Sequence, residues 1–403
     1  MNNILEKSDW TLLQMFLPAG WEEQARATGA FARARCVASP SALLRLVLVL
    51  CGVGLSYQRT TEVAALCGVG EMSKVSLWER LQRCRGWLEW LVEGLLGNSV
   101  ERPAAGGYRP VAVDGSVVAG PRGKVQARLH FVLDLLSLRP LQVRVTSLKE
   151  GEGLGCLRVA PGELWIGDRG FARVKNVALA KAGGAEVLVR LGRRTLRLYR
   201  QDGAPLDPLV VGRQLEGYTP GGCEAWCETP SGGRTAGRLV VVRLSPSAAA
   251  QAQAKLRRTG QRKQRQMAAE TIEMAGYLCL FTTAPAERLS VAEVLGWYRA
   301  RWQVELAFKR LKSLLKASEL RATSDERARI WLLGKMVYAL LLHACLDQAG
   351  AFSPWGYPVP RCAEAPTDQL QPGLGADRVD EPGAGGGGAG LRPGAVAGVV
   401  GRG

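Results

Sequence analysis

The hydrophobic residues of this 403-residue chain change their spacing near residue 108, and this change restricts the fold more than any other feature. Up to about residue 100 they recur at helical spacing, as in LLRLVLVL. From Tyr108 onward they follow strand patterns, in RPVAVDGSVVAG, LHFVLDLL and LQVRVTSL. ELWIGDRGFA predicts a fourth strand, and ARVKNVALAKAGG predicts a helix closed by glycine. Three strands followed by a strand–helix unit predict an α/β fold, a mixed sheet with flanking helices.

These patterns divide the chain into four predicted parts. Residues 1–100 form an N-terminal helical domain, and residues 101–185 and 286–348 together form the α/β domain. Residues 186–285 contain short strands between Gly/Pro turns, which indicates a β-rich insertion into that domain. Residues 349–403 are dominated by Gly, Pro and Ala. Because such a tail cannot bury enough apolar surface to offset its ordering entropy, we predict that it is disordered.

The charge of the chain indicates the class of partner. It contains 53 Lys and Arg against 36 Asp and Glu, a net charge of +17, which favours nucleic acid or an anionic membrane surface. A solvated basic surface without a partner is the alternative. The most apolar stretch, Ser41–Leu55, is short for a membrane span and contains Arg45, so we predict a core helix there. With no membrane segment and no export signal expected, the prediction is a cytoplasmic protein with reduced thiols.

Two basic segments are candidates for contact with DNA. TTEVAALCGVGEMSKVSLWERLQR fits a helix-turn-helix with its turn at Gly68 and with Ser73 capping a second helix. That second helix carries Lys74, Arg80 and Arg83; a plain helical hairpin is the alternative. AKLRRTGQRKQRQ contains no acid, so a solvated face and a track for phosphates are both open.

Three acids stand out by their positions. Asp114 interrupts an apolar strand and Asp168 ends another, each beside a glycine, whereas Glu305 lies on a long helix. Burying a carboxylate without a partner costs free energy, so two such aspartates and a helical glutamate indicate a common task. Oxygen ligands are what two Mg²⁺ ions need to clamp a phosphodiester. For each aspartate alone, hydrogen bonding to local backbone at a turn or strand end is the alternative, so the argument rests on the set.

The helix that carries Glu305 is the best-defined element of the sequence. Ser290 and Glu293 form a capping box at its start, and no proline interrupts it up to about Lys316. On a continuous helix, four polar side chains fall on a stripe about 60° wide, namely Tyr298, Arg301, Glu305 and Lys312. An apolar stripe lies beside it and includes Val304 and Phe308. One acid among two cations and a phenol suits a site that holds a metal and grips phosphates; exposed pairs such as Arg301–Glu305 are the alternative.

These residues carry a resemblance to a known family. The spacing Tyr298-x2-Arg301-x3-Glu305-x6-Lys312 resembles the Y-R-E-K signature of the insertion-sequence-four group of DDE transposases. VAVDGS resembles the family's first-aspartate motif, with Ser116 in place of threonine, and WIGDRGF resembles its second. The resemblance runs from about Trp10 to Gln348 and implies a ribonuclease-H-like catalytic domain interrupted by a β-rich insertion.

The resemblance also implies roles. Asp114, Asp168 and Glu305 would bind two Mg²⁺ ions, with Mn²⁺ also suitable, for cleavage and strand transfer at the ends of an insertion sequence. Tyr298, Arg301 and Lys312 would contact DNA phosphates near the cleaved end. The partners implied are double-stranded DNA, at transposon ends and target, and a second copy of the chain in a synaptic complex. The alternative is a catalytically impaired, decayed copy that only binds DNA.

Overall fold

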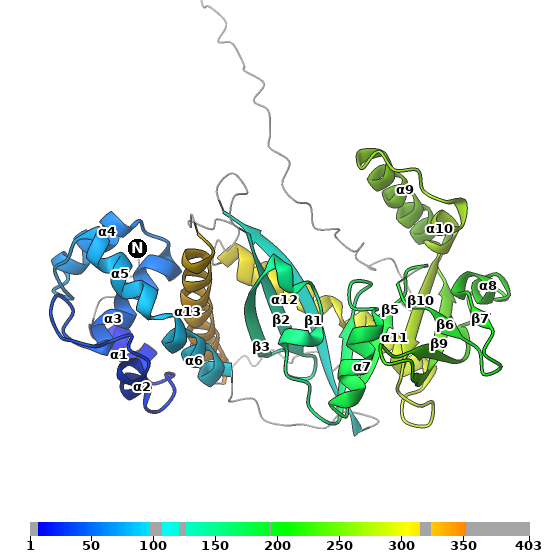
Figure 1. The fold of residues 1–403 in the computed structure, drawn as a ribbon, viewed down its shortest axis with the longest axis horizontal. Helices are drawn as coiled ribbons and strands as arrows, with labels where there is room; N and C mark the ends of the chain where they lie inside the picture. Colours follow the sequence, from blue (N-terminus) through cyan, green and yellow to red (C-terminus); the bar gives the residue numbers. More distant parts are fainter. Residues whose placement is uncertain (1–6, 97–106, 121–125, 194, 315–323, 352–403) are drawn as a thin grey trace, which may run out of the picture.

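The computed structural model describes residues 7–96, 107–120, 126–193, 195–314 and 324–351. Three groups of elements follow one another along the long axis of the molecule (Figure 1). N-terminal helices lie at one end, the strands β1 to β5 lie in the middle, and the strands and helices of residues 198–282 lie at the other end.

The N-terminal group is entirely helical in its described part. Its elements are α1 (Lys7–Gln14), α2 (Trp21–Ala27), α3 (Pro40–Val47), the π-helix η1 (Leu48–Val53), α4 (Tyr57–Leu66), α5 (Lys74–Arg83) and α6 (Arg85–Leu96). The apolar stretch Ser41–Leu55 forms most of α3 and all of η1, and the residues from Leu43 to Cys51 are buried except Arg45. The prediction of a core helix there is confirmed, although its second half is a π-helix.

Helices α4 and α5 contain the proposed helix-turn-helix. Gly68 has a φ of 65°, and the Ser73 hydroxyl accepts a hydrogen bond from the backbone N–H of Ser76, so the predicted turn residue and cap are both in place. Residues 67–73 join the two helices, however, which is longer than the three to four residues typical of the motif. A role of this segment in reading DNA stays a prediction.

The ten strands of the described residues form one continuous mixed sheet in the order β3-β2-β1-β4-β5-β10-β9-β8-β6-β7. The strands are β1 (Arg109–Ala119), β2 (Gln126–Asp134), β3 (Pro140–Ser147), β4 (Glu163–Gly167), β5 (Glu186–Arg190), β6 (Leu198–Tyr199), β7 (Pro205–Leu206), β8 (Gly221–Glu228), β9 (Arg234–Arg243) and β10 (Tyr277–Thr282). Strands β1, β4 and β5 are parallel, whereas β2 and β3 pair in antiparallel fashion. The predicted α/β fold with a mixed sheet is confirmed.

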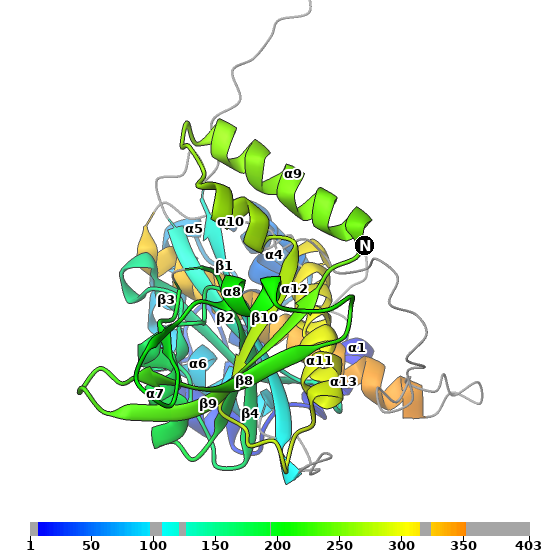
Figure 2. The same ribbon diagram turned by 90° about the vertical axis from the view of Figure 1, so that its right-hand side faces the viewer.

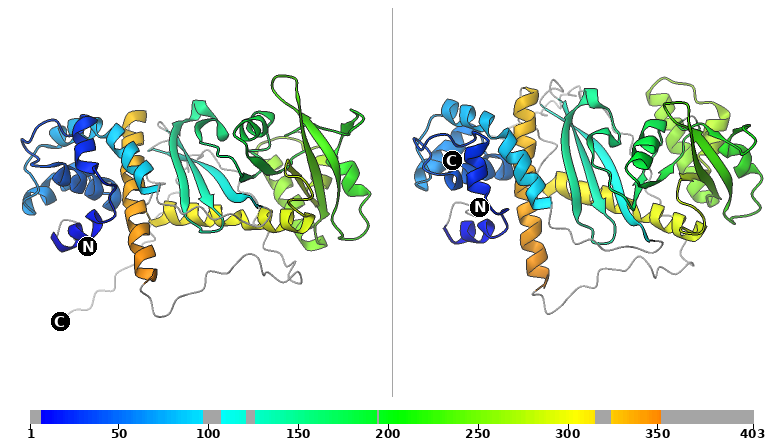
Figure 3. Two further views of the ribbon diagram at one scale, coloured as in Figure 1. Left: turned by 90° about the horizontal axis from the view of Figure 1, so that it is seen from below. Right: turned by 60° about the horizontal axis from the view of Figure 1, so that its bottom comes forward.

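Helices cover both faces of this sheet. The remaining helices are α7 (Val174–Ala182), α8 (Pro208–Arg213), α9 (Pro246–Arg262), α10 (Ala269–Met274), α11 (Val291–Ala300), α12 (Trp302–Leu314) and α13 (Asp325–Ala351), with 3-10 turns η4 (Leu148–Glu150) and η5 (Leu154–Cys156). α11 and α12 run in line along one side of the sheet, and α13 stands between the sheet and the N-terminal helices (Figure 3). One apolar core therefore joins the N-terminal helices, α11 to α13 and one face of the sheet, and a second core lies on the face that α7 covers.

The helix that begins at Ser290 differs from its prediction in one respect. The capping box is present, because the Ser290 hydroxyl accepts from the Glu293 N–H and the Glu293 carboxylate accepts from the Ser290 N–H. The helix is interrupted at Arg301, where the backbone N–H of Val304 bonds to the Arg301 carbonyl at 3.0 Å, three residues back instead of four. No proline or glycine marks this interruption, so the prediction of an unbroken helix was wrong.

The predicted domain boundaries lie within this architecture as follows. Residue 186, the proposed start of the insertion, is also the first residue of β5, which pairs with β4 on one side and β10 on the other. The segment up to residue 285 contains strands as expected, and also the helices α8, α9 and α10. Both the boundaries and the insertion stay predictions, and the tail from residue 352 lies outside the described residues.

Among the described residues, one helix is long and apolar enough to cross a membrane by length and composition alone. It is the Asp325–Leu346 part of α13, and 56% of its most apolar window is buried inside the protein. α13 packs against α6, η1, β2 and β3, which is the environment of a core helix.

Candidate active site

Asp114 occupies a position in β1 that would otherwise belong to the core. Side chains alternate along the strand, so that Val111 and Val113 enter the core beside α7 and Ala112 enters the core beside α12. Asp114 shares the face of Ala112 and pairs with Phe131 of β2, whose ring meets Phe308 of α12 edge-on at 5.6 Å. The strand period therefore directs the Asp114 carboxylate toward α12.

Asp168 reaches the same place through the register of the parallel strands. Ala112 of β1 pairs with Ile166 of β4, and the same register continued by two residues brings Asp168 beside Asp114. The chain turns sharply after β4, where a Cβ at Gly167 would lie 2.6 Å from the Cβ of Phe171. The Asp168 carboxylate accepts the backbone N–H of Gly170 at 2.8 Å, which fixes this turn. The glycine beside Asp168 is thus required by packing, and the aspartate is held at the carboxyl edge of the sheet.

Glu305 stands on the first turn of α12, one turn before Phe308. Its Oε1 accepts a hydrogen bond from Nη2 of Arg301 at 2.6 Å, across the interruption between α11 and α12. The Arg301 residue is 5% exposed, so this is an ion pair at the edge of the core and not on an open helix surface. The Arg301–Glu305 pair, which the sequence left open as the alternative to a functional site, is therefore present. It lies within the candidate site.

Three partly buried carboxylates face one region at the edge of the sheet. The pKa of Asp114 is raised to about 7, first by burial of the carboxyl group and second by the neighbouring Asp168 carboxylate. The Arg301 guanidinium and the Gly115 N–H lower this pKa, and Glu305 raises it slightly. Asp168, Glu305 and Arg301 are thus all close enough to Asp114 to affect its pKa. A bound cation would reduce the repulsion among the three carboxylates.

The donor set suits a hard divalent cation. All three groups are carboxylates, and the cation would offset the repulsion that raises the Asp114 pKa. Within the described residues, no three His, Cys, Asp or Glu side chains lie close enough together to ligate one ion. Because the Glu305 carboxylate is turned to Arg301, a three-carboxylate site requires Glu305 to leave this guanidinium.

The three residues predicted to contact DNA are placed unequally. Tyr298 is 4% exposed, and the Arg301 guanidinium lies 5.5 Å from the centre of its ring. Lys312 lies on α12, but its side chain is outside the described residues. Tyr298 and Arg301 therefore form the buried support behind Glu305, and a contact with a phosphate by any of the three stays a prediction.

Glu152 is a fourth acid at this site, and the sequence did not single it out. A Cβ at Gly115 would lie 2.7 Å from its Oε1, and a Cβ at Gly170 would lie 2.9 Å from its Oε2 and 3.1 Å from Oδ1 of Asp168. Arg128 of β2 faces it at 3.7 Å. The only sequence signal was the glycine on each side of Glu152. These glycines are typical of a tight loop, but they do not predict which residues Glu152 contacts.

Comparison with known proteins connects this geometry to a family. Residues 105–342 match the family described as the transposase DDE domain, which is more than half of the chain. The transposase for insertion sequence element IS421 of Escherichia coli is 32% identical over 346 residues, covering 84% of this chain and 93% of that protein. The InsL protein of insertion sequence element IS186A, from Escherichia coli K12, is 32% identical over 345 residues with the same coverage. The protein belongs to the DDE transposase family.

The family match spans the whole site. All six residues of the predicted site, from Asp114 to Lys312, fall within residues 105–342. A more distant relative, the transposase for insertion sequence element IS231F of Bacillus thuringiensis subsp. israelensis, is 26% identical over 211 residues, 47% of this chain and 43% of that protein. The resemblance drawn from the residue spacing is confirmed at the level of the family, and the described sheet agrees with a ribonuclease-H-like DDE domain.

Proposed function

We propose that this DDE-family chain is a transposase that cleaves DNA at the ends of an insertion sequence and transfers the freed strand to target DNA. In the first step water attacks a phosphodiester and releases a 3′-hydroxyl. That hydroxyl then attacks a second phosphodiester, so one P–O bond forms as another breaks. Asp114, Asp168 and Glu305 would hold two Mg²⁺ ions, or Mn²⁺, which supply charge stabilisation to the attacking and leaving oxygens.

One observation carries this proposal. The fold buries the Asp114 carboxyl group beside the carboxylate that follows β4 and opposite the one on α12, and this burial, together with the Asp168 charge, raises the pKa of Asp114 to about 7. Burying like charges side by side destabilises a fold, so such an arrangement is kept mainly where a function requires it, and strongly perturbed pKa values therefore point to functional sites. The family match and the similarity to named transposases support the assignment of this site to DNA transposition.

A cationic side chain pairs with one of the proposed metal ligands. Arg301 holds Glu305 by a 2.6 Å hydrogen bond, and Tyr298 supports the guanidinium from behind. We propose that Glu305 exchanges Arg301 for the cation when DNA binds. The released guanidinium, with Tyr298 and Lys312 nearby on the same pair of helices, would then face the phosphates of the cleaved end.

The wider setting follows from the family relationship. We propose double-stranded DNA as the substrate, a homodimer in a synaptic complex, and action in the cytoplasm at the nucleoid. The parts of the chain would divide this work, with residues 1–100 binding DNA, residues 101–185 and 286–348 performing the chemistry, and residues 186–285 forming the insertion.

Strand cleavage tests the proposed chemistry. Labelled duplex from the end of the element is incubated with Mg²⁺ and with wild type or Glu305→Gln. The glutamine keeps the size of the side chain but removes the charge, so we expect cleavage to fall at least on the order of 10³-fold, as the loss of several kcal/mol of transition-state stabilisation requires. Glu216→Gln changes an exposed glutamate and is the matched control, with wild-type cleavage expected.

Three outcomes separate the alternatives. Cleavage by wild type and by Glu216→Gln, but not by Glu305→Gln, supports the proposal. Equal cleavage by all three proteins rejects the assigned site. No cleavage by wild type that still binds the element end would identify the decayed, DNA-binding copy.

A further inference from the structure

The helices α9 and α10 form an arm at one edge of the sheet. β9 leads into α9, and the chain returns through residues 263–268 and α10 to β10. α9 stands clear of the sheet, with α10 on its inner side (Figures 1 and 2). Within the described residues, α10 is the element against which α9 makes its main contacts. We call residues 246–274 the helical arm.

Strand direction places the helical arm at the same edge as the catalytic carboxylates. β5 runs parallel to β4, β10 runs antiparallel to β5, and β9 runs antiparallel to β10. β9 therefore points the same way as β1 and β4, and its carboxyl end lies on the edge where Asp168 follows β4. Three strand spacings separate β4 from β9, which is about 14 Å.

The arm also rises above this edge. Arg190, the last residue of β5, pairs with Leu280 of β10, whereas β10 begins three residues earlier at Tyr277, opposite Arg243 of β9. Three residues of strand extend about 10 Å. The base of the arm is therefore raised beyond the end of β5, roughly five base pairs of duplex away from Asp168.

Charge is distributed unequally on the arm. No Asp or Glu occurs between residues 229 and 269, and the arm carries six cations, namely Lys255, Arg257, Arg258, Arg262, Lys263 and Arg265. All of them except Lys255 are exposed. Such a set cannot neutralise itself, and it suits a partner with repeated negative charge.

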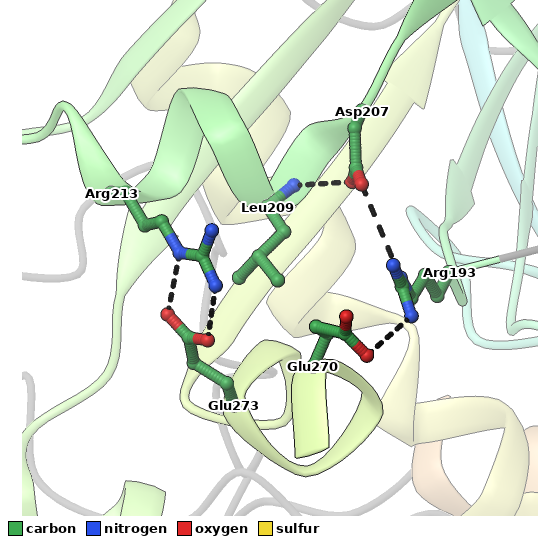
Figure 4. Close-up of polar contacts among 6 residues, drawn as sticks. All are labelled: Arg193, Asp207, Leu209, Arg213, Glu270 and Glu273. Carbon is green, nitrogen blue, oxygen red and sulfur yellow. Dashed lines mark hydrogen bonds and ion pairs between the residues drawn. The ribbon is translucent and has the colours of Figure 1, made fainter. Parts of the chain in front are cut away.

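The acids of α10 are turned inward, away from this basic surface. Glu273 accepts two hydrogen bonds from Arg213 of α8, at 2.8 and 2.6 Å, and Glu270 accepts one from Arg193 at 2.9 Å (Figure 4). Arg193 also lies 4.0 Å from Asp207, the residue that caps α8 (Figure 4). These contacts fix α10 against the body of the protein and leave the outer side of the arm basic.

A chain of basic residues joins the arm to the carboxylates. Arg169 follows Asp168 directly, and its Cδ would lie 3.8 Å from a Cβ at Gly192, beyond the end of β5. Arg193 comes next and holds Glu270 of the arm. Two arginines, Arg169 and Arg193, therefore lie between Asp168 and the helical arm.

We propose that the helical arm binds the phosphate backbone of duplex DNA that continues past the scissile phosphate along this edge. The inference rests on the proposed function for the position of the scissile phosphate. The contact is independent of sequence, because exposed Lys and Arg side chains recognise phosphates and not base edges. The arm fixes the path of the duplex while Asp114, Asp168 and Glu305 act on one bond.

Two double variants with equal charge change test this surface. The arm variant combines Arg258→Gln and Lys263→Gln. The control combines Arg158→Gln and Arg197→Gln, which are exposed cations near the amino ends of β4 and β6, at the edge of the sheet away from the arm. Binding to element-end duplexes is measured without metal ions as a function of salt concentration.

Duplex length gives the decisive comparison. On a duplex that extends about 15 base pairs on each side of the scissile phosphate, we expect the arm variant to bind on the order of tenfold more weakly, with a log–log salt slope reduced by about 0.9 for each lost contact. A duplex limited to about five base pairs on each side ends at the base of the arm and does not extend to Arg258 and Lys263 at the far end of α9, so on this duplex the arm variant should bind like wild type. The control variant should match wild type on both.

Several results would overturn the arm as a DNA contact. They are wild-type binding of the long duplex by the arm variant, an equal loss on the short duplex, or an equal loss in the control variant. The outcome is separate from the proposed chemistry, since length-dependent loss of binding supports the arm even if wild type fails to cleave. Conversely, normal cleavage with no effect of the arm variant rejects only the arm.

Discussion

Two aspartates on the paired strands β1 and β2 have opposite environments. Asp134, at the edge of the sheet away from the catalytic cluster, is 2% exposed, and its Oδ2 accepts hydrogen bonds from Nε and Nη2 of Arg109 at 3.0 and 2.8 Å. Its other oxygen accepts the N–H groups of Leu136 and Ser137. Asp114 accepts the N–H of Gly115 and otherwise faces like charge, from Asp168 and Glu305, with Arg301 as the opposing cation.

The difference shows that burial alone does not identify a functional acid. Both aspartates interrupt apolar strand sequences, and their strands are neighbours in the same sheet. A structural carboxylate has its oxygens satisfied by the protein, as Asp134 has. A functional carboxylate keeps unbalanced charge, as Asp114 does, and the protein bears the cost because a ligand is meant to balance it.

The largest expected effect is the loss of DNA cleavage when an acid at the catalytic edge is replaced. Asp114→Asn should lower cleavage of the element end by at least on the order of 10³-fold, because a neutral amide is a poor ligand for a hard cation. Its melting temperature should not fall, since the substitution removes repulsion from Asp168. A variant that cleaves normally, or that unfolds, would place Asp114 in the same class as Asp134.

The pH dependence of stability should separate the two aspartates next. The Asp114 pKa is about 7 in the folded protein against an ordinary value of 3.8, so the folded state binds this proton more tightly than the unfolded state. The protonated Asp114 therefore stabilises the folded state fully below about pH 4, and this stabilisation is lost as pH rises toward 7. The free energy of unfolding should fall by about 2 to 4 kcal/mol over this range. Denaturant unfolding without divalent ions should show this loss in wild type relative to Asp114→Asn. Parallel curves for the two proteins would contradict the raised pKa, and Mg²⁺ should restore stability to wild type at pH 7.

Asp134 should give the reverse pattern. Asp134→Asn weakens the ion pair with Arg109 and leaves a partly buried guanidinium without its counter-charge, so we expect a loss of about 2 to 3 kcal/mol of unfolding free energy. Where the variant remains folded, cleavage should stay close to that of wild type. A variant with full stability but no cleavage would show that both edges of the sheet take part in the reaction.

The sequence predicted the parts of this comparison that depend on local patterns. Strand alternation and the glycines beside Asp114 and Asp168 led to both acids, and the capping box at Ser290 marked the start of the helix pair that carries Glu305. These features are local, because side-chain period and caps are set within a few residues.

Long-range contacts account for what the sequence did not predict. Glu152 reaches the site from a loop whose position depends on packing against β1 and the turn after β4. The helix is interrupted at Arg301, whose side chain donates a hydrogen bond to Glu305. Helix propensities do not predict such a side-chain contact. The basic segment lies mostly in α9, and its position at the catalytic edge follows only from the directions of four strands.

The smallest expected effect concerns Glu163, a second buried acid near Asp134. Its Oε2 accepts the N–H of Ala160 at 2.9 Å and the indole N–H of Trp165 at 2.8 Å, and burial raises its pKa. Because an amide oxygen can accept both bonds and carries no charge to desolvate, Glu163→Gln should change the unfolding free energy by less than about 1 kcal/mol. Cleavage should be unchanged, so a large loss of cleavage at full stability would extend the functional cluster to this edge. By our proposal, the same Glu-to-Gln change at Glu305 removes cleavage. Comparing the two variants therefore tests whether the role of a buried glutamate is decided by its position in the fold, since the chemical change is the same.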